Sequence, residues 1–160
     1  MDMIVAKARM SKTTIYSRFP NKAALFEAVV TDHVERKFDT IEALADARLG
    51  LRDQLLLLGQ AFVDAATEPE ARAIDRIVMA EAPAFPALAS RLHRAGYARS
   101  TAMVRRLLAA ANARNPTVGA EAFYSLLALI PMRTLLIDRD AAPPDVERIV
   151  DFVLLGSGVP

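Results

Sequence analysis

The stretch Ser11-Lys12-Thr13-Thr14-Ile15-Tyr16-Ser17-Arg18-Phe19-Pro20-Asn21-Lys22 reads as a short basic helix between two stop signals. Ser11 is a favourable N-cap, because its hydroxyl can accept a hydrogen bond from an unpaired backbone N–H group of the first turn. Ile15 and Phe19 lie four residues apart and therefore share one apolar face of the helix. Pro20 ends the helix, because a proline ring clashes with the preceding turn. Lys22 then begins a second, longer helix.

The residues before this helix suggest a helix-turn-helix. Residues 2–9 are expected to form another short helix, with Ile4, Val5 and Ala8 on its apolar side and a turn at 10–11. In helix-turn-helix proteins the second helix enters the DNA major groove. Residues 1–22 contain five basic side chains and one acidic side chain, a balance of +4, whereas the whole chain carries +1. The alternative interpretation is a basic face exposed to solvent.

The rest of the chain has helical periodicity and no strand pattern, so an all-α fold of roughly eight helices is predicted. Thr67 is expected to cap one helix, with Pro69 at an early position and Glu70 at the third position after the cap. Pro131 is expected to kink the most apolar helix. The predicted helices after the first two cover residues 22–47, 51–66, 67–81, 87–114, 118–138 and 145–155.

Composition excludes several classes of protein. The chain has no Cys, which rules out disulfides, thiolate metal sites and a Cys nucleophile. Only two His residues are present, and no metal-ligand motif, phosphate loop or catalytic triad is recognisable, so neither an enzyme nor a cofactor is expected. No apolar run reaches the length of a membrane span, and no signal peptide is recognisable. We therefore expect a soluble, cytoplasmic protein that does not enter membranes.

The residues from Ser11 to Phe26 fit the pattern S-x-x-T-[IL]-Y-x-x-F-x-x-K-x-x-L-[FL]. This pattern resembles the DNA-binding region of the tetracycline-repressor (TetR) family of bacterial transcription regulators. The segment Glu81-Ala82-Pro83-Ala84-Phe85-Pro86-Ala87-Leu88 is similar to the AefR-like subgroup of TetR C-terminal domains. The resemblance implies a partial helix-turn-helix region with a linker helix over residues 1–47, followed by a helical effector-binding and dimerisation domain over residues 48–160.

The resemblance also implies roles for single residues, in a ligand-responsive repressor that binds a double-stranded DNA operator. Thr14, Tyr16 and Lys22 match positions that hold DNA phosphates. Lys12, Thr13 and Ser17 match positions that face base edges or the groove wall, and Ser11 begins the helix. Each residue also has a structural alternative: Tyr16 can cover the edge of the core, Thr14 can bond a backbone group, and Lys22 can face solvent.

Two departures from the family pattern bear on DNA binding. Arg9 stands where the family usually has Gly in the turn. The chain also begins inside the motif, so the family's first helix, which braces Ile15 and Phe19, is expected to be missing. We expect weak DNA binding from such a truncated unit. The alternative function is a helical dimerisation or small-molecule-binding module that does not bind DNA.

An apolar cavity between helices is the expected effector site. Its candidate residues are aromatic, sulfur-containing or polar side chains of the second domain, although such residues at helical spacing are commonly just core. The last two helices, around residues 122–136 and 146–155, are too apolar to face solvent and are expected to form a homodimer interface. The effector candidates are Phe62, Met79, His93, Tyr97, Met103, Tyr124 and Arg133.

Overall fold

The computed structural model describes residues 11–44, 46, 48–136 and 144–159, and within these ranges it contains seven helices and no strand. The all-α prediction is confirmed. The expected helix over residues 2–9 and the turn that contains Arg9 lie outside the described residues. The helices are α2 (Lys12–Arg18), α3 (Lys22–Ala43), α4 (Leu51–Thr67), α5 (Pro69–Glu81), α6 (Pro86–Ala110), α7 (Pro116–Leu136) and α8 (Val146–Ser157).

Local capping explains where α2 and α3 begin and end. The Ser11 hydroxyl accepts a hydrogen bond from the Thr14 backbone N–H at 3.0 Å, as its N-cap role predicts. The Asn21 side chain accepts from the Ala24 backbone N–H at 2.8 Å and so starts α3 directly after Pro20. These two caps fix a sharp corner between α2 and α3. Helix α3 ends at Ala43, four residues before the predicted end.

The predicted cap of α5 is wrong. Thr67 is the last residue of α4, and its hydroxyl donates to the Val63 carbonyl at 2.9 Å instead of capping the next helix. Glu68 occupies the cap position of α5 without a side-chain hydrogen bond, and Pro69 stands at the start of the helix as predicted. A hydroxyl within reach of the carbonyl four residues back takes that local partner, and this competes with capping.

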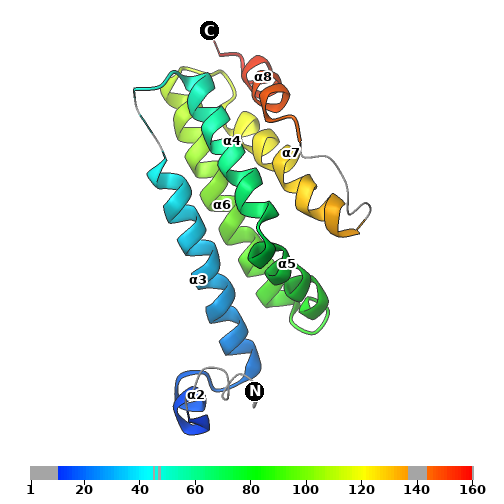
Figure 1. The fold of residues 1–160 in the computed structure, drawn as a ribbon. Coiled ribbons are helices and arrows are strands. Elements are labelled where there is room, and N and C mark those ends of the chain that lie inside the picture. Colours follow the sequence, from blue (N-terminus) through cyan, green and yellow to red (C-terminus); the bar gives the residue numbers. More distant parts are fainter. Residues whose placement is uncertain (1–10, 45, 47, 137–143, 160) are drawn as a thin grey trace.

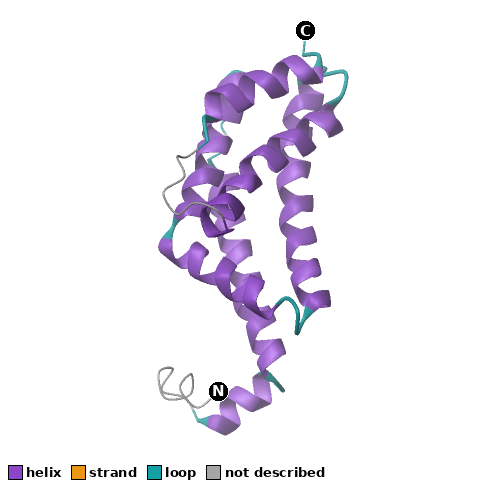
Figure 2. Cartoon of the chain, turned by 90° about the vertical axis from the view of Figure 1, so that its right-hand side faces the viewer, coloured by secondary structure: helices purple, strands orange, loops and turns teal. Residues whose placement is uncertain are grey.

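The helices form an elongated bundle with α2 at one end and α8 at the other (Figures 1 and 2). Helix α3 runs alongside α4 and α6, whereas α7 and α8 pack against α4 and α6 on the other side. The main core lies where α4, α6, α7 and α8 meet. Its most deeply buried side chains are Leu55, Val104, Leu108, Phe123 and Val150. No helix in the described ranges combines the length and apolarity needed to cross a membrane.

Two glycines allow the helices of this core to approach closely. A Cβ atom on Gly59 of α4 would lie 2.5 Å from Val146 Cγ1 and 3.3 Å from Phe123 Cζ. A Cβ atom on Gly119 of α7 would lie 2.0 Å from Ser157 Oγ. Both distances are far below van der Waals contact, so α4, α7 and α8 can pack at this separation only with glycine at these positions.

We expect the substitution Gly59→Ala to destabilise the fold by about 1–3 kcal/mol, because it over-packs a filled core. Gly156→Ala is the matched control: it is also a helical glycine, but an added Cβ meets nothing within 4 Å. The control should be neutral or more stable by up to about 1 kcal/mol, since alanine favours helix. Urea unfolding measures both, and equal free energies of unfolding for the two variants would contradict the close-packing interpretation.

Candidate DNA-contact surface and ligand cavity

Helix α2 separates its residues into a buried anchor and an exposed face. Ile15 is 4% exposed, whereas Tyr16 is 46% exposed. The other candidates for DNA contact, Ser11, Lys12, Thr13, Thr14, Ser17 and Lys22, are all exposed as well. The structure therefore brings the whole predicted set to one accessible region, while their contacts with DNA stay a prediction.

The hydroxyl groups of α2 are largely used within the helix. The Ser11 and Thr14 hydroxyl oxygens lie 2.8 Å apart in a hydrogen bond, and the Ser17 hydroxyl donates to the Thr14 carbonyl at 2.9 Å. The first of these bonds lies at the start of α2 and the second in its last turn. The Thr14 hydroxyl therefore has the Ser11 hydroxyl as its partner, and not the backbone group of the structural alternative.

Lys22 makes a contact that the sequence does not reveal. Its Nζ atom donates to Glu81 Oε1 at 2.7 Å and forms an ion pair with it. Glu81 is the last residue of α5, so this pair joins the corner between α2 and α3 to a helix 59 residues further along the chain. The Lys22 side chain is about two-thirds exposed at 66%, which leaves it accessible to an alternative anionic partner.

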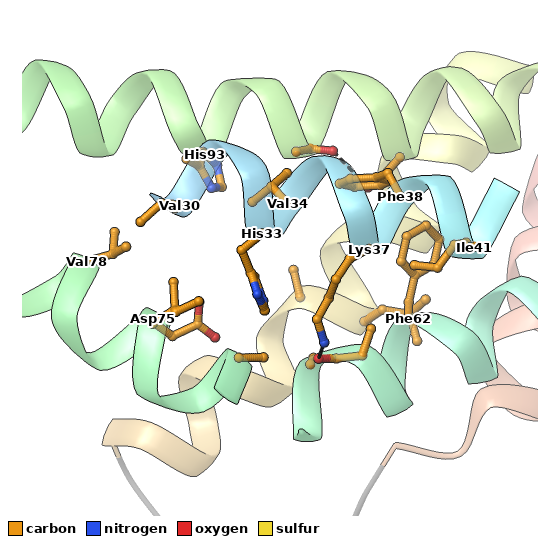
Figure 3. Close-up of a pocket in the computed structure, with 18 of the residues that line it drawn as sticks. Val30, His33, Val34, Lys37, Phe38, Ile41, Phe62, Asp75, Val78 and His93 are labelled. Atoms are coloured by element: carbon orange, nitrogen blue, oxygen red, sulfur yellow. Dashed lines mark hydrogen bonds between the residues drawn. The ribbon is translucent and has the colours of Figure 1, made fainter. Parts of the chain in front are cut away.

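A cavity of about 340 Å³ lies between α3, α4, α5, α6 and α7 (Figure 3). Helix α3 lines it along three turns, from Val30 to Ile41. Helix α5 faces α3 across the cavity, and α6 and α7 complete the walls. Most of the lining is aliphatic or aromatic, so the cavity suits an apolar ligand. The α3 residues that line it are Val30, His33, Val34, Lys37, Phe38 and Ile41.

The structure brings three of the seven predicted effector residues into this cavity: Phe62, His93 and Tyr124. Tyr97 lies directly behind them, stacked on His93 and edge-on to Tyr124 with ring centroids 5.2 Å apart. The roles of all seven in binding an effector stay predictions.

The two methionines lie elsewhere. Met79 is exposed on α5, and Met103 is buried with Ile41 and Leu58 beside a smaller cavity of about 150 Å³. The side chain of Arg133 lies outside the described residues.

Comparison with known proteins identifies the fold and the family. Residues 53–153 match the C-terminal domain of AefR-like transcriptional repressors, and residues 1–29 match bacterial regulatory proteins of the tetR family. The chain belongs to the TetR family. The resemblance stated from the Ser11–Phe26 motif is thereby confirmed, and the chain is a TetR-family transcriptional regulator.

Individual TetR-family relatives agree with this assignment. Uncharacterized HTH-type transcriptional regulators of Mycobacterium bovis and Mycobacterium tuberculosis are 29% identical over 161 residues, which covers 98% of this chain and 76% of each relative. The crystal structure of a TetR-family protein from Mesorhizobium loti has a TM-score of 0.79 at 24% identity, over 98% of this chain and 85% of that one. At that identity the structure supports the fold alone.

Three ionisable residues that line the cavity were not predicted from the sequence: His33, Lys37 and Asp75. The sequence does contain a pattern from which these three residues could have been predicted. His33 and Lys37 interrupt the apolar stripe of α3, and Asp75 lies on the stripe of α5 that contains Ala71 and Val78. A polar side chain within an apolar helical face must meet either a partner or a cavity.

Burial and charge set the ionisation of these groups. Burial raises the pKa of the Asp75 carboxyl group, and the nearby His33 and Lys37 side chains partly oppose that rise. Burial also raises the pKa of the Tyr124 phenol, with a further contribution from Asp75. The Lys37 ammonium already has two partners, because its Nζ atom donates to the Ala65 carbonyl at 2.7 Å and pairs with Glu68 at 2.5 Å. No cluster of metal-ligating side chains exists among the described residues.

Arg99 of α6 clamps α3 at the end of the cavity. Its guanidinium donates two hydrogen bonds of 3.0 Å to Glu42 and one of 2.6 Å to Asp39. The same guanidinium lies 5.3 Å from the ring centroid of Phe38, which lines the cavity. These bonds lower the pKa of the Glu42 carboxyl group and raise the pKa of Arg99. The clamp thus fixes the position of α3, the helix that follows α2.

We expect Arg99→Gln to reduce the free energy of unfolding by about 1 kcal/mol at pH 7, since the network is partly exposed and screened. Because the pKa of Glu42 is lowered from 4.5, the stabilisation is present above about pH 4.5 and is lost as the pH falls through the lowered value. Urea unfolding at pH 7 and pH 3.5 should therefore show a difference from the unaltered protein that shrinks in acid.

Arg36→Gln is the control for this experiment. It removes an exposed pair with Asp32 at four-residue spacing, which should change stability by less than about 0.5 kcal/mol. An equal effect of the two substitutions, or an Arg99 effect that does not change with pH, would contradict the clamp.

Proposed function

We propose that this TetR-family regulator is a ligand-responsive repressor that binds operator DNA as a homodimer. One observation carries the proposal: α3 lines the cavity with six residues and also continues directly from the corner that holds α2. A ligand in the cavity would therefore contact the helix that positions the candidate DNA-contact residues. We also propose that residues 1–47 form the DNA-binding part and that residues 48–160 form the ligand-binding and dimerisation part.

The ligand can act only if it binds two positions of α3 with different affinity. The cavity offers a basis for this difference, because its walls come from α3 on one side and from α5, α6 and α7 on the other. A ligand that fills the cavity favours one separation of these helices. By thermodynamic linkage, the free-energy difference between ligand binding to the two positions of α3 appears as an equal change in the free energy of DNA binding.

The Lys22–Glu81 pair supplies a second link between ligand and DNA. Lys22 matches a phosphate-binding position of the family, but its Nζ atom is paired with Glu81 in this conformation. Glu81 ends the helix that lines the cavity through Ala71, Ile74 and Asp75. We infer that DNA phosphate and Glu81 compete for Lys22, so a shift of α5 changes how available Lys22 is to DNA.

The proposed dimer interface lies on α7 and α8. Large apolar side chains are exposed there, with Leu155 at 84% and Phe152 at 60% on α8, and Val118 and Leu129 on α7. A two-fold axis would place this surface against the same surface of a second copy and bury these side chains in a closed dimer. Such a dimer presents two copies of α2 to two half-sites of an operator.

Binding of the chain to DNA tests the repressor proposal. Duplexes selected from a randomised pool by the chain itself serve as the probe, and fluorescence anisotropy at several salt concentrations gives the affinity. Lys22→Ala should weaken binding several-fold on all sequences and reduce the salt slope by about 1, as expected for a lost phosphate contact. Glu81→Gln should strengthen binding by up to about fivefold, because Lys22 loses its competitor.

The control is Asp53→Asn, which removes the same charge from an exposed position in the first turn of α4, a helix outside both the DNA-contact set and the proposed dimer interface. It should leave the affinity unchanged, and Glu81→Gln should have no effect when combined with Lys22→Ala. Absence of any salt-dependent DNA binding would overturn the proposal and favour the helical module that does not bind DNA.

Charge placed in the α7–α8 surface tests the dimer. The double substitution Phe152→Glu and Leu155→Glu should give a monomer, because both side chains are exposed in the single chain and buried only against a partner. The unaltered protein should sediment as a dimer at micromolar concentration. Arg76→Glu, on an exposed part of α5, is the control and should leave the dimer intact. A monomer for the unaltered chain at all concentrations would contradict the proposal.

A further inference from the structure

The cavity between α3 and α5 has one polar end. His33 and Asp75 extend from these two facing helices into the same space (Figure 3). His93 of α6 and Tyr124 of α7 also line the cavity. The remaining walls are formed by side chains such as Phe38, Phe62 and Leu127. A ligand that uses the whole cavity therefore needs one polar group and an apolar body.

Asp75 is the group at the polar end that requires a partner. Its carboxyl group is half-buried, and neither oxygen has a hydrogen-bond partner within the described part of the chain. Partial burial without a hydrogen-bond donor makes the ionised carboxylate less favourable than it is in water. A ligand that brings N–H donors to Asp75 would recover that cost, whereas one that brings only acceptors would not.

The charged side chains around Asp75 determine which sign of charge a ligand can carry at this end of the cavity. Besides Asp75, two carboxylates stand near this end: Glu68 pairs with Lys37, and Glu70 lies 3.7 Å from His33 Nδ1. Three carboxylates face one ammonium, so the formal charge is −2 with His33 neutral and −1 with His33 protonated. Lys37 is already used by Glu68 and the Ala65 carbonyl. The field therefore favours a cation and opposes an anion.

The size and walls of the cavity define the body of the ligand. A volume of about 340 Å³ lies at the small end of the range for small-molecule sites. Phe38 and Phe62 meet edge to face with ring centroids 6.0 Å apart, and Phe62 meets Phe123 in the same way. This aromatic wall suits a compact apolar group and leaves the polar end to a single head group.

We propose that the cavity binds a compact lipophilic amine, whose protonated nitrogen is held by Asp75 and whose apolar body lies between Phe38, Phe62 and Leu127. His33 and Tyr124 complete the surroundings of the head group. Because this is the cavity through which we propose the ligand response, the inference rests on the proposed function and names the chemical class of the effector.

Three probes with one apolar body test the proposal: 4-phenylbutylamine, 4-phenylbutan-1-ol and 4-phenylbutyrate. They differ only in a cationic, neutral or anionic head group. Isothermal titration calorimetry with the full chain should give a dissociation constant for the amine at least about tenfold lower than for the alcohol, with the acid weakest. A preference for the acid, equal binding of all three, or no binding of any would overturn the proposal.

Substitutions test whether Asp75 is the residue responsible for the preference for the amine. Asp75→Asn keeps the shape of the side chain and should bring the amine to the affinity of the alcohol, with alcohol binding unchanged within about twofold. Glu35→Gln, which removes an exposed carboxylate of α3 that does not line the cavity, should change amine binding by less than about twofold. An amine preference that survives Asp75→Asn would overturn the assignment to Asp75. The probe comparison in the unaltered protein stands even if the Asn variant unfolds.

DNA anisotropy with and without the amine separates this inference from the proposed function. If the amine binds through Asp75 but does not change DNA affinity, the amine site stands and the ligand response fails. If DNA is bound selectively but the amine shows no preference over the acid, the repressor stands and the amine site fails.

Discussion

The packing of α3 against α6 is the contact on which the rest of the molecule depends. Val30, Phe38 and Ile41 are buried on one face of α3, and Arg99 ties the neighbouring Asp39 and Glu42 to α6. Without that contact α3 would neither close the cavity nor hold α2 at a fixed place relative to the bundle. A 22-residue helix of mixed polarity gains its stability mainly from such packing, not from its own propensity.

The two sides of the bundle are built to different densities. On the α4–α7–α8 side, Gly59 and Gly119 let helix backbones approach until no additional methyl group fits. On the α3–α5 side, a cavity of about 340 Å³ remains and carries polar groups. An unfilled cavity lowers the free energy of unfolding in proportion to its volume. The densely packed α4–α7–α8 side must therefore supply the stability that the α3–α5 side lacks. The dense side therefore gives α3 and α5 a rigid surface against which they can shift.

Features of this fold that depend on neighbouring residues in the chain could be predicted from the sequence. Features that depend on how the helices pack together could not. Ser11 acts on Thr14, three residues away, so the α2 cap could be predicted, and the apolar spacing of Ile15 and Phe19 predicted the buried face. Phe62, His93 and Tyr124 line the cavity, and their role in binding an effector stays a prediction. Met103 is buried beside a smaller cavity. The positions of His33 and Asp75 on the cavity wall were not predicted, because which faces of α3 and α5 meet depends on the angles at which the helices pack. Thr67 shows the same limit locally, since a hydroxyl can satisfy either of two backbone groups.

Helix α5 connects the two ends of the proposed response. Asp75 lies in its middle and Glu81 at its end, six residues or about 9 Å along one helix. An α-helix moves as a unit over such a length, so a ligand that draws Asp75 toward the cavity also displaces Glu81. Lys22 is then either held more firmly or released, and Lys22 stands at the corner from which α2 projects. In the proposed response, α3 and α5 together join the cavity to the candidate DNA-contact residues, and coupling needs no longer path than these two helices.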